Sequence, residues 1–236
     1  MMEKVCSIHH TSQRWKTLFG DVDSRALWGE SLRPERIYYK GDISALPDRR
    51  RPKILITGTR LAGSEQEAVT ADVIYHLSCN PSKPIIITAL ACGVSETALR
   101  YALAFDVPVA LVMPCSLEEV YPASLAGLAD DITSRPGSVM LSQFDKGTAA
   151  TAINFIIRSK TMAAMASAAV IPFTKEKGSA VMTARLMHDI GKPVYAVPGR
   201  ITDELSRGCN MLISEGTAAI LADYGLLDRI KTHANP

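Results

Sequence analysis

The sequence predicts an α/β fold in which a doubly wound, mostly parallel sheet is covered by helices on both faces. Short apolar runs of strand length recur from Lys53 onward, and amphipathic helical patterns separate them. Strands that are buried on both faces of a parallel sheet have such continuous apolar runs, and right-handed helical crossovers connect them. A fold of this kind binds its ligands beyond the carboxyl ends of the strands.

The first expected strand organises this prediction. Residues Ile54 to Thr57 are apolar or β-branched, and Gly58, Thr59 and Arg60 follow before a helical pattern begins. A buried strand that ends in such a turn places backbone N–H groups and a guanidinium group at one edge of the sheet, which suits an anion. An ordinary turn with a surface arginine is the alternative, and this stretch alone leaves both open.

The remaining elements alternate in the same way. Strands are expected over 85–87, 107–113, 138–141, 168–171 and 194–197, and helices over 63–78, 93–105, 121–129, 151–165, 182–190, 209–214 and 222–231. Gly191 is expected to end the helix before it. Four loops, 58–60, 88–93, 113–122 and the one that starts at 198, should converge on one crevice.

Residues 1–50 show few patterns of buried strands, unlike the rest of the chain, and they carry both tryptophans, Trp15 and Trp28. We expect them to form short helices and an extended arm packed on a Rossmann-like domain of residues 51–236. The basic run 49–53 precedes the first strand. It is either a solvated linker or a phosphate-contacting patch beside Arg60.

Composition narrows the function. The 236 residues are 47% hydrophobic, without a run of about 18 apolar residues or a signal-peptide core, so we expect a cytoplasmic protein with no membrane contact. The five cysteines form no C-x-x-C pair, which argues against zinc and disulfides. Residues 1–60 hold 12 Lys and Arg against 7 Asp and Glu, within a chain of net charge +2. A nucleic-acid site must therefore be a local patch.

The sequence does not complete any of the catalytic or cofactor-binding motifs considered. Gly58 and Gly63 have the glycine spacing of a P-loop, but Ser64 and Glu65 stand where Lys and Ser or Thr are needed. The turn also lacks the glycines of a dinucleotide site, and no nucleophile is paired with a base. We expect no enzyme activity, no cofactor and no metal.

The segment Asn154 to Lys160 holds two cations, Arg158 and Lys160, two positions apart. Such positions do not share a helix face. If the segment is a turn that enters the helix, both cations reach the crevice. If it is helical, it is a solvated face with Phe155 in the core.

Read together, these segments resemble the DNA-processing protein A family (DprA/Smf). The resemblance covers roughly residues 36 to 220. It rests on motifs whose order and spacing agree with the family: Gly58-Thr59-Arg60, residues 88–95, Tyr121-Pro122, residues 155–160, Thr183-Ala184-Arg185, Val197-Pro198-Gly199 and residues 208–213 with Gly216.

The resemblance implies an extended Rossmann fold, a homodimer, binding and protection of single-stranded DNA, and loading of the RecA recombinase during natural transformation. It implies phosphate contacts from Arg60, Arg158 and Lys160 and from the amides of Gly58 and Thr59. Small residues would let the strand approach. The full set of expected DNA-binding residues is Gly58, Thr59, Arg60, Thr88, Ala89, Gly93, Phe155, Arg158, Ser159, Lys160, Gly199 and Asn210.

The chain departs from the family pattern at several positions. Ala89, Ser95 and Leu99 replace the family's Gly, Asp and His, and Ile156, Ser159 and Lys160 replace its Pro, Asn and Arg. Lys160 keeps the charge but loses the bidentate fork of arginine. With Pro236 as the last residue, we expect a divergent, minimal member without the C-terminal winged helix. The dimer interface is expected on the late helices, residues 182–190 among them.

Two other functions stay open. A nucleoside-monophosphate phosphoribohydrolase shares this type of fold, but its Pro-Gly-Gly signature fails because Arg200 follows Pro198-Gly199. The second alternative function is that of a nucleotide-sensing module, since a glycine-lined crevice with an arginine also suits a mononucleotide.

Overall fold

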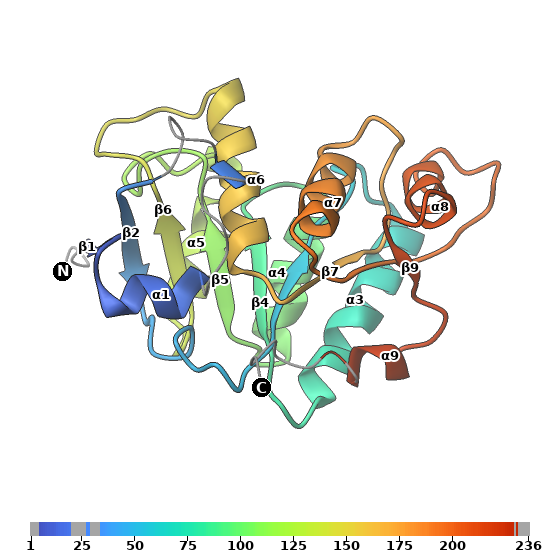
Figure 1. Ribbon diagram of the computed structural model, residues 1–236, viewed down its shortest axis with the longest axis horizontal. Helices are drawn as coiled ribbons and strands as arrows, with labels where there is room; N and C mark the ends of the chain where they lie inside the picture. The colour runs from blue at the N-terminus through green and yellow to red at the C-terminus, as the bar shows by residue number, and fades with distance from the viewer. Residues whose placement is uncertain (1–4, 20–26, 29–33, 229, 231–236) are drawn as a thin grey trace.

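The computed structural model describes residues 5–19, 27–28, 34–228 and 230 (Figure 1). Within them lies one sheet of nine strands in the order β1-β2-β6-β5-β4-β3-β7-β8-β9. The strands are β1 (Cys6–His9), β2 (Arg36–Gly41), β3 (Lys53–Ile56), β4 (Ile85–Ala89), β5 (Val109–Val112), β6 (Val139–Ser142), β7 (Ala168–Ile171), β8 (Val194–Ala196) and β9 (Ala219–Ile220). The ladders from β6 to β9 are parallel, which confirms the predicted fold class.

The central strands are apolar along their whole length because both faces of the sheet are covered. Every residue of β3 to β7 is buried. Their side chains divide between two hydrophobic cores, one on each face. Since these strands are parallel, their carboxyl ends meet at one edge of the sheet, called the carboxyl edge below, and the four predicted loops leave from it.

Two layers of helices cover the sheet. α3 (Ser64–Cys79), α4 (Val94–Ala104) and α5 (Ala126–Thr133) contribute to one core, and a 3-10 turn, η1 (Ala123–Leu125), precedes α5. α1 (Gln13–Phe19), α6 (Ala152–Met165), α7 (Ser179–Asp189) and α8 (Arg207–Ser214) contribute to the other. The short α9 (Gly225–Asp228) packs on α3. The predicted helix over 222–231 is thus shorter in its described part, and residues 229 and 231 lie outside the described residues.

Helix bounds follow local chemistry. The Thr151 hydroxyl accepts a hydrogen bond from the Asn154 N–H at 3.4 Å and caps α6. Gly191 adopts φ 71° after α7, which confirms the expected C-cap. α7 begins at Ser179, three residues before the predicted start, where Gly178 is its N-cap.

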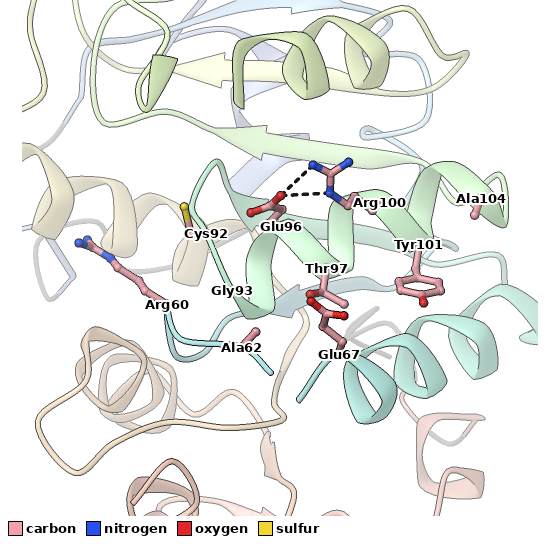
Figure 2. A pocket seen from close by; sticks show the side chains of 10 residues that line it. All are labelled: Arg60, Ala62, Glu67, Cys92, Gly93, Glu96, Thr97, Arg100, Tyr101 and Ala104. Carbon is pink, nitrogen blue, oxygen red and sulfur yellow. Dashed lines mark hydrogen bonds and ion pairs between the residues drawn. The ribbon is translucent and has the colours of Figure 1, made fainter. Parts of the chain in front are cut away.

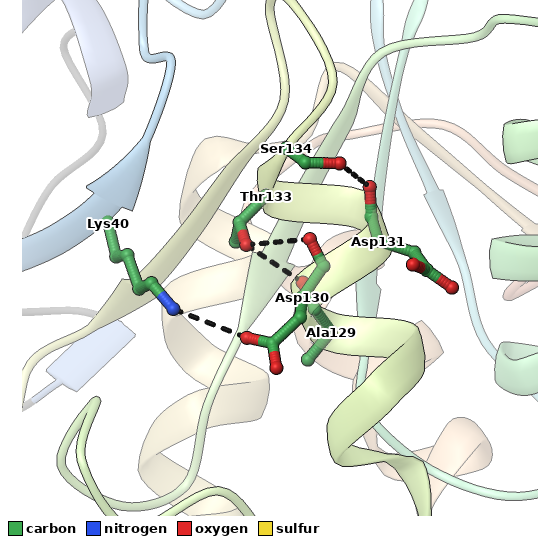
Figure 3. Close-up of polar contacts among 6 residues, drawn as sticks. All are labelled: Lys40, Ala129, Asp130, Asp131, Thr133 and Ser134. Carbon is green, nitrogen blue, oxygen red and sulfur yellow. Dashed lines mark hydrogen bonds and ion pairs between the residues drawn. The ribbon is translucent and has the colours of Figure 1, made fainter. Parts of the chain in front are cut away.

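The N-terminal region departs from the predicted arm of short helices and extended chain. β1 and β2 pair with each other, and β2 pairs antiparallel with β6, Tyr38 opposite Ser142. The region therefore extends the main sheet. Lys40 on β2 reaches the Asp130 carboxylate on α5 at 3.3 Å (Figure 3). Trp15 and Trp28 are buried in the same core as α6.

The basic run 49–53 lies at the amino end of β3, whereas Arg60 follows the carboxyl end. Arg50 is ion-paired with Asp48, and the Arg51 Nε donates to the Lys83 carbonyl at 2.7 Å. The idea that this run forms a phosphate patch beside Arg60 is therefore wrong. Among the helices of the described ranges, none has the length and apolar character needed to cross a bilayer.

Candidate functional site

Two turns interlock at the carboxyl edge. A Cβ atom on Gly58 would lie 2.5 Å from the Phe173 carbonyl oxygen and 2.7 Å from a methyl carbon of Val94. Gly93 adopts φ 75°, and a Cβ atom there would lie 2.4 Å from the Thr59 carbonyl oxygen. Both positions thus require glycine, since only a residue without a Cβ fits. The close fit fixes the backbone from which Arg60 projects.

The peptide groups of Thr59 take part in this interlock. The Thr59 N–H donates to the Phe173 carbonyl at 2.8 Å, and the Thr59 carbonyl accepts from the Val94 N–H at 3.1 Å. The expectation that the Thr59 amide faces a phosphate is therefore wrong, because that donor already has a partner. The turn offers a ligand the Arg60 side chain instead.

Arg60, Phe155 and Arg158 form the core of the site. The guanidinium carbon of Arg60 lies 5.8 Å from the centre of the Phe155 ring, and that of Arg158 lies 5.0 Å from it. These distances are typical of cation–π contacts. Two cations from different elements, the β3 turn and α6, thus converge on one aromatic ring.

Arg158 is the most unusual residue of this group. It is 7% exposed, yet its Nε and Nη1 atoms have no hydrogen-bond partner among the described residues. Burial, and then the nearby charge of Arg60, lowers the pKa of Arg158 to about 10. A desolvated cation with open donors costs free energy unless an anion completes it. This arrangement is suited to bind a phosphate or carboxylate.

Lys160 does not lie beside Arg158. The whole segment 154–160 is part of α6, so the turn considered for it is absent. Two positions along a helix differ by about 200° around its axis. Arg158 points into the protein, while Lys160 is partly exposed. A DNA contact by Lys160 stays a prediction that this geometry does not favour.

Three other predicted site residues belong to the protein interior. Thr88 is 0% exposed and donates to the Ile56 carbonyl at 2.8 Å. Ala89 is part of the hydrophobic core. The buried Ser159 hydroxyl donates to the Phe155 carbonyl at 3.0 Å. They hold the strand and helix that carry the site, and none of them faces solvent.

Gly199 and Asn210 form a clamp further along the carboxyl edge. The Asn210 amide nitrogen donates to the Gly199 carbonyl at 2.9 Å, and the Gly199 N–H donates to the Asn210 side-chain oxygen at 3.1 Å. Both polar groups of Asn210 therefore serve the loop after β8. Their expected DNA contact stays a prediction, while their structural role is direct.

A pocket of about 520 Å³ opens between α3 and α4 next to this site (Figure 2). Arg60 borders one end of it and Tyr101 the other, with Glu67 between them. Glu96 in its wall is ion-paired with Arg100 at 2.8 Å. The charges that line the pocket therefore balance, whereas two cations converge on the Phe155 side of Arg60, which serves an anion better. Among the described residues, no group of His, Cys, Asp or Glu is arranged to hold a metal ion.

The chain matches one protein-family model over most of its length. The model of the family described as DNA recombination-mediator protein A matches residues 24–229. The chain belongs to this family. Its members are described as recombination mediators, and the sequence resemblance is confirmed.

Individual relatives agree with this assignment. The chain is 26% identical to DNA processing protein DprA of Streptococcus pneumoniae over 194 residues, which cover 82% of the chain and 66% of that protein. It is 28% identical to a putative DprA of Mycobacterium tuberculosis, covering 70% of the chain and 41% of that protein. The chain thus spans between 41% and 66% of the length of these two relatives.

Solved structures share the fold. The X-ray structure of DprA from Streptococcus pneumoniae superposes with a TM-score of 0.77 at 25% identity, covering 94% of this chain and 72% of that one. DprA from Helicobacter pylori, whose structure is described as giving insight into its single-stranded DNA binding mode, superposes with a TM-score of 0.78 at 22% identity. That match covers 97% of this chain and 95% of the other.

One residue near the site was missing from the expected set. The ring of Tyr121 lies 5.7 Å from that of Phe155, in an edge-to-face arrangement, and Tyr121 is 48% exposed. The Tyr-Pro motif in the loop after the third predicted strand was the available signal. An exposed aromatic ring at the carboxyl edge is the pattern that points to a stacking role.

Proposed function

We propose that this protein binds single-stranded DNA as a recombination mediator, protects it, and helps to load the RecA recombinase in natural transformation. The observation that carries the proposal is Arg158, a buried cation with two unpartnered donor atoms beside Phe155 and Arg60. A backbone phosphate supplies the missing acceptor, and Phe155 and Tyr121 supply rings for base stacking.

The family assignment supports this choice over a nucleotide-sensing module. The related Helicobacter pylori protein is described as binding single-stranded DNA. The aromatic rings next to the cations favour single strands, because bases in a duplex are already stacked on each other. The chain covers only part of its longer relatives, so RecA loading and dimer formation are both proposals here.

The central experiment is a titration of labelled single-stranded and duplex oligonucleotides with the parent protein and Arg158→Met. We expect the parent to prefer the single strand. We expect Arg158→Met to bind it roughly thirtyfold more weakly, since hydrogen bonds to charged groups contribute about 1.5–3 kcal/mol. Arg135→Ala is the control. Arg135 follows α5 and pairs with Asp106, which follows α4, and both lie at the amino ends of the strands, away from the site. Equal binding by the parent and Arg158→Met would refute the assignment.

The RecA part needs its own assay. We expect the protein to speed the assembly of RecA recombinase on single-stranded DNA, measured as the lag before DNA-dependent ATP hydrolysis begins. Arg158→Met should lose the effect. An unchanged lag with the parent protein would reject the mediator role and leave DNA binding intact.

A homodimer belongs to the same proposal, with α7 as the expected interface. Met182 and Leu186 are partly exposed and border a depression of about 400 Å³ together with Arg185. Light scattering of the parent and of Met182→Glu tests this. A monomeric parent, or a dimer that survives the substitution, contradicts the interface.

A further inference from the structure

The loop of residues 198–206, which follows β8, is held rigidly at its base. Besides the two hydrogen bonds between Gly199 and Asn210, the loop closes tightly on itself. A Cβ atom on Gly199 would lie 2.2 Å from the Ser206 hydroxyl oxygen. The loop therefore leaves the carboxyl edge in a defined direction.

Its far arm is fixed as well. The Asp203 carboxylate accepts from the Ser206 hydroxyl at 2.5 Å and from the Leu205 N–H at 3.0 Å. These bonds, the Ser206 bond above all, lower the pKa of Asp203, with help from the charge of Arg200. Glu204 pairs with Lys175 at 2.9 Å and ties the loop to the segment after β7.

The tip of this ordered loop is left in solvent. Ile201 is 83% exposed, the highest value among the exposed large hydrophobic residues of the described chain. Arg200 beside it is exposed, and its guanidinium group makes no hydrogen bond or ion pair within the described residues. A rigid loop thus presents an apolar side chain and an available cation together.

The tip stands on the same edge of the sheet as Arg60. β3 neighbours β7, and β7 neighbours β8, so the ends of β3 and β8 are two strand spacings, or about 10 Å, apart. Figure 1 shows the loops after β7 and before α8 rising on the same side of the sheet as the start of α6. A single strand of a few nucleotides spans such a separation.

We infer that the tip of the 198–206 loop is a second contact for the DNA strand held at Arg60 and Arg158. Arg200 binds a backbone phosphate, and Ile201 packs against an unstacked base, as apolar side chains do when they insert between bases. The strand then runs along the carboxyl edge from β3 to β8. This inference rests on the proposed function and adds to it a path across the protein.

The test compares oligonucleotides of two lengths, about two and about twenty nucleotides, in anisotropy titrations, because a dinucleotide with one phosphate is too short to occupy both contacts. The variants are Arg200→Ala and Ile201→Ser. Their controls are Arg135→Ala and Phe105→Ala. Phe105 is an exposed apolar residue at the C-terminal end of α4, away from the carboxyl edge. We expect Arg200→Ala to weaken binding of the long strand about fivefold and to lower its salt slope by about 0.7, the value for one single-strand phosphate contact. Ile201→Ser should weaken it about threefold. The short strand should bind all four variants like the parent.

Each other result overturns the inference in a recognisable way. If Arg158→Met loses binding while both loop variants bind the long strand like the parent, the second contact does not exist and the proposed function stands. If the parent binds no single strand at all, the proposed function itself fails. If Ile201→Ser alters the mass in light scattering, the tip joins two copies of the chain instead.

Discussion

Two cations with little exposure to solvent belong to or contact α6, and their hydrogen-bonding groups differ: Arg158 lies in the middle of the helix and is buried, and Lys192 contacts its C-terminal end and is partly buried. Arg158, in the half nearer the carboxyl edge, has two donor atoms without partners. Lys192, which precedes β8 at the opposite edge, donates to the Ala163 and Ala164 carbonyls at 2.9 and 2.6 Å. Burial is the main cause that lowers both pKa values, to about 10 for Arg158 and about 7 for Lys192.

We interpret the difference as one between a structural amino group, Lys192, and a guanidinium group, Arg158, that is proposed to bind a ligand. The Lys192 amino group donates to the last carbonyl groups of a helix, so its donors have partners inside the protein. Arg158 lies over the Phe155 ring at 5.0 Å, but its Nε and Nη1 atoms have no acceptor among the described residues. The cost of these open donors to the fold is the reason why we propose a binding site at Arg158, with the missing acceptor supplied by the ligand.

The largest effect on stability is expected for Arg158→Met. Replacing an uncompensated buried charge by an apolar side chain of similar length should raise the free energy of unfolding by about 1–3 kcal/mol. Chemical denaturation of the DNA-free protein measures this. A variant that is less stable than the parent would mean that Arg158 supports the fold.

The opposite sign is expected for Lys192→Met. Removing a donor that serves two helix carbonyls should lower the free energy of unfolding by about 1–2 kcal/mol at pH 9, without an effect on DNA binding. The folded pKa of about 7 lies below the unfolded value, so between these pH values the unfolded chain holds more protons. The parent should therefore gain stability from pH 7 to pH 9.

This pH dependence sharpens the test of Lys192. Between pH 7 and pH 9, the free energy of unfolding of Lys192→Met should rise less than that of the parent. The rise that remains in the variant should come from Lys53, whose pKa is lowered to about 8 mainly by burial. Denaturation curves at pH 7, 8 and 9 measure both slopes. Parallel slopes for parent and variant would contradict the role given to Lys192.

The smallest effect is expected for Arg60→Ala. Arg60 is exposed and screened by salt, so its loss should weaken single-strand binding about fivefold near physiological salt and lower the salt slope by about 0.7. Arg158→Met should cost more affinity than Arg60→Ala. The reverse order would show that the exposed arginine carries the site.

Much of the fold could be predicted from the sequence because the central strands are apolar on both faces. Continuous apolar runs of this kind predict buried parallel strands, as at Ile54 to Ile56 and Ile85 to Ile87. β2 was missed because Ile37 is buried while Tyr38 and Tyr39 are only partly so, and such a short alternating run before a basic stretch resembles extended chain. β9 has two exposed residues and leaves no periodic signal.

The site was predictable only in part. Gly58 and Arg60 could be placed because the end of a parallel strand fixes where they lie. The distribution of hydrogen bonds could not be foreseen, so Thr88 and Thr59 were expected to face a ligand although their polar groups bond within the protein. The burial of Arg158 depends on α6 packing against the sheet, which no local pattern in 154–160 encodes.

The pairing of β2 with β6 has a consequence for biosynthesis. Tyr38 and Lys40 have their partners at Ser142 and Met140, about a hundred positions later in the chain. During translation, β2 can pair with β6 only after residue 142 has left the ribosome. Closing so long a loop is entropically costly and slow. β2, with Tyr38 and Tyr39, is therefore left without its β6 neighbour until more than half of the 236 residues have been made.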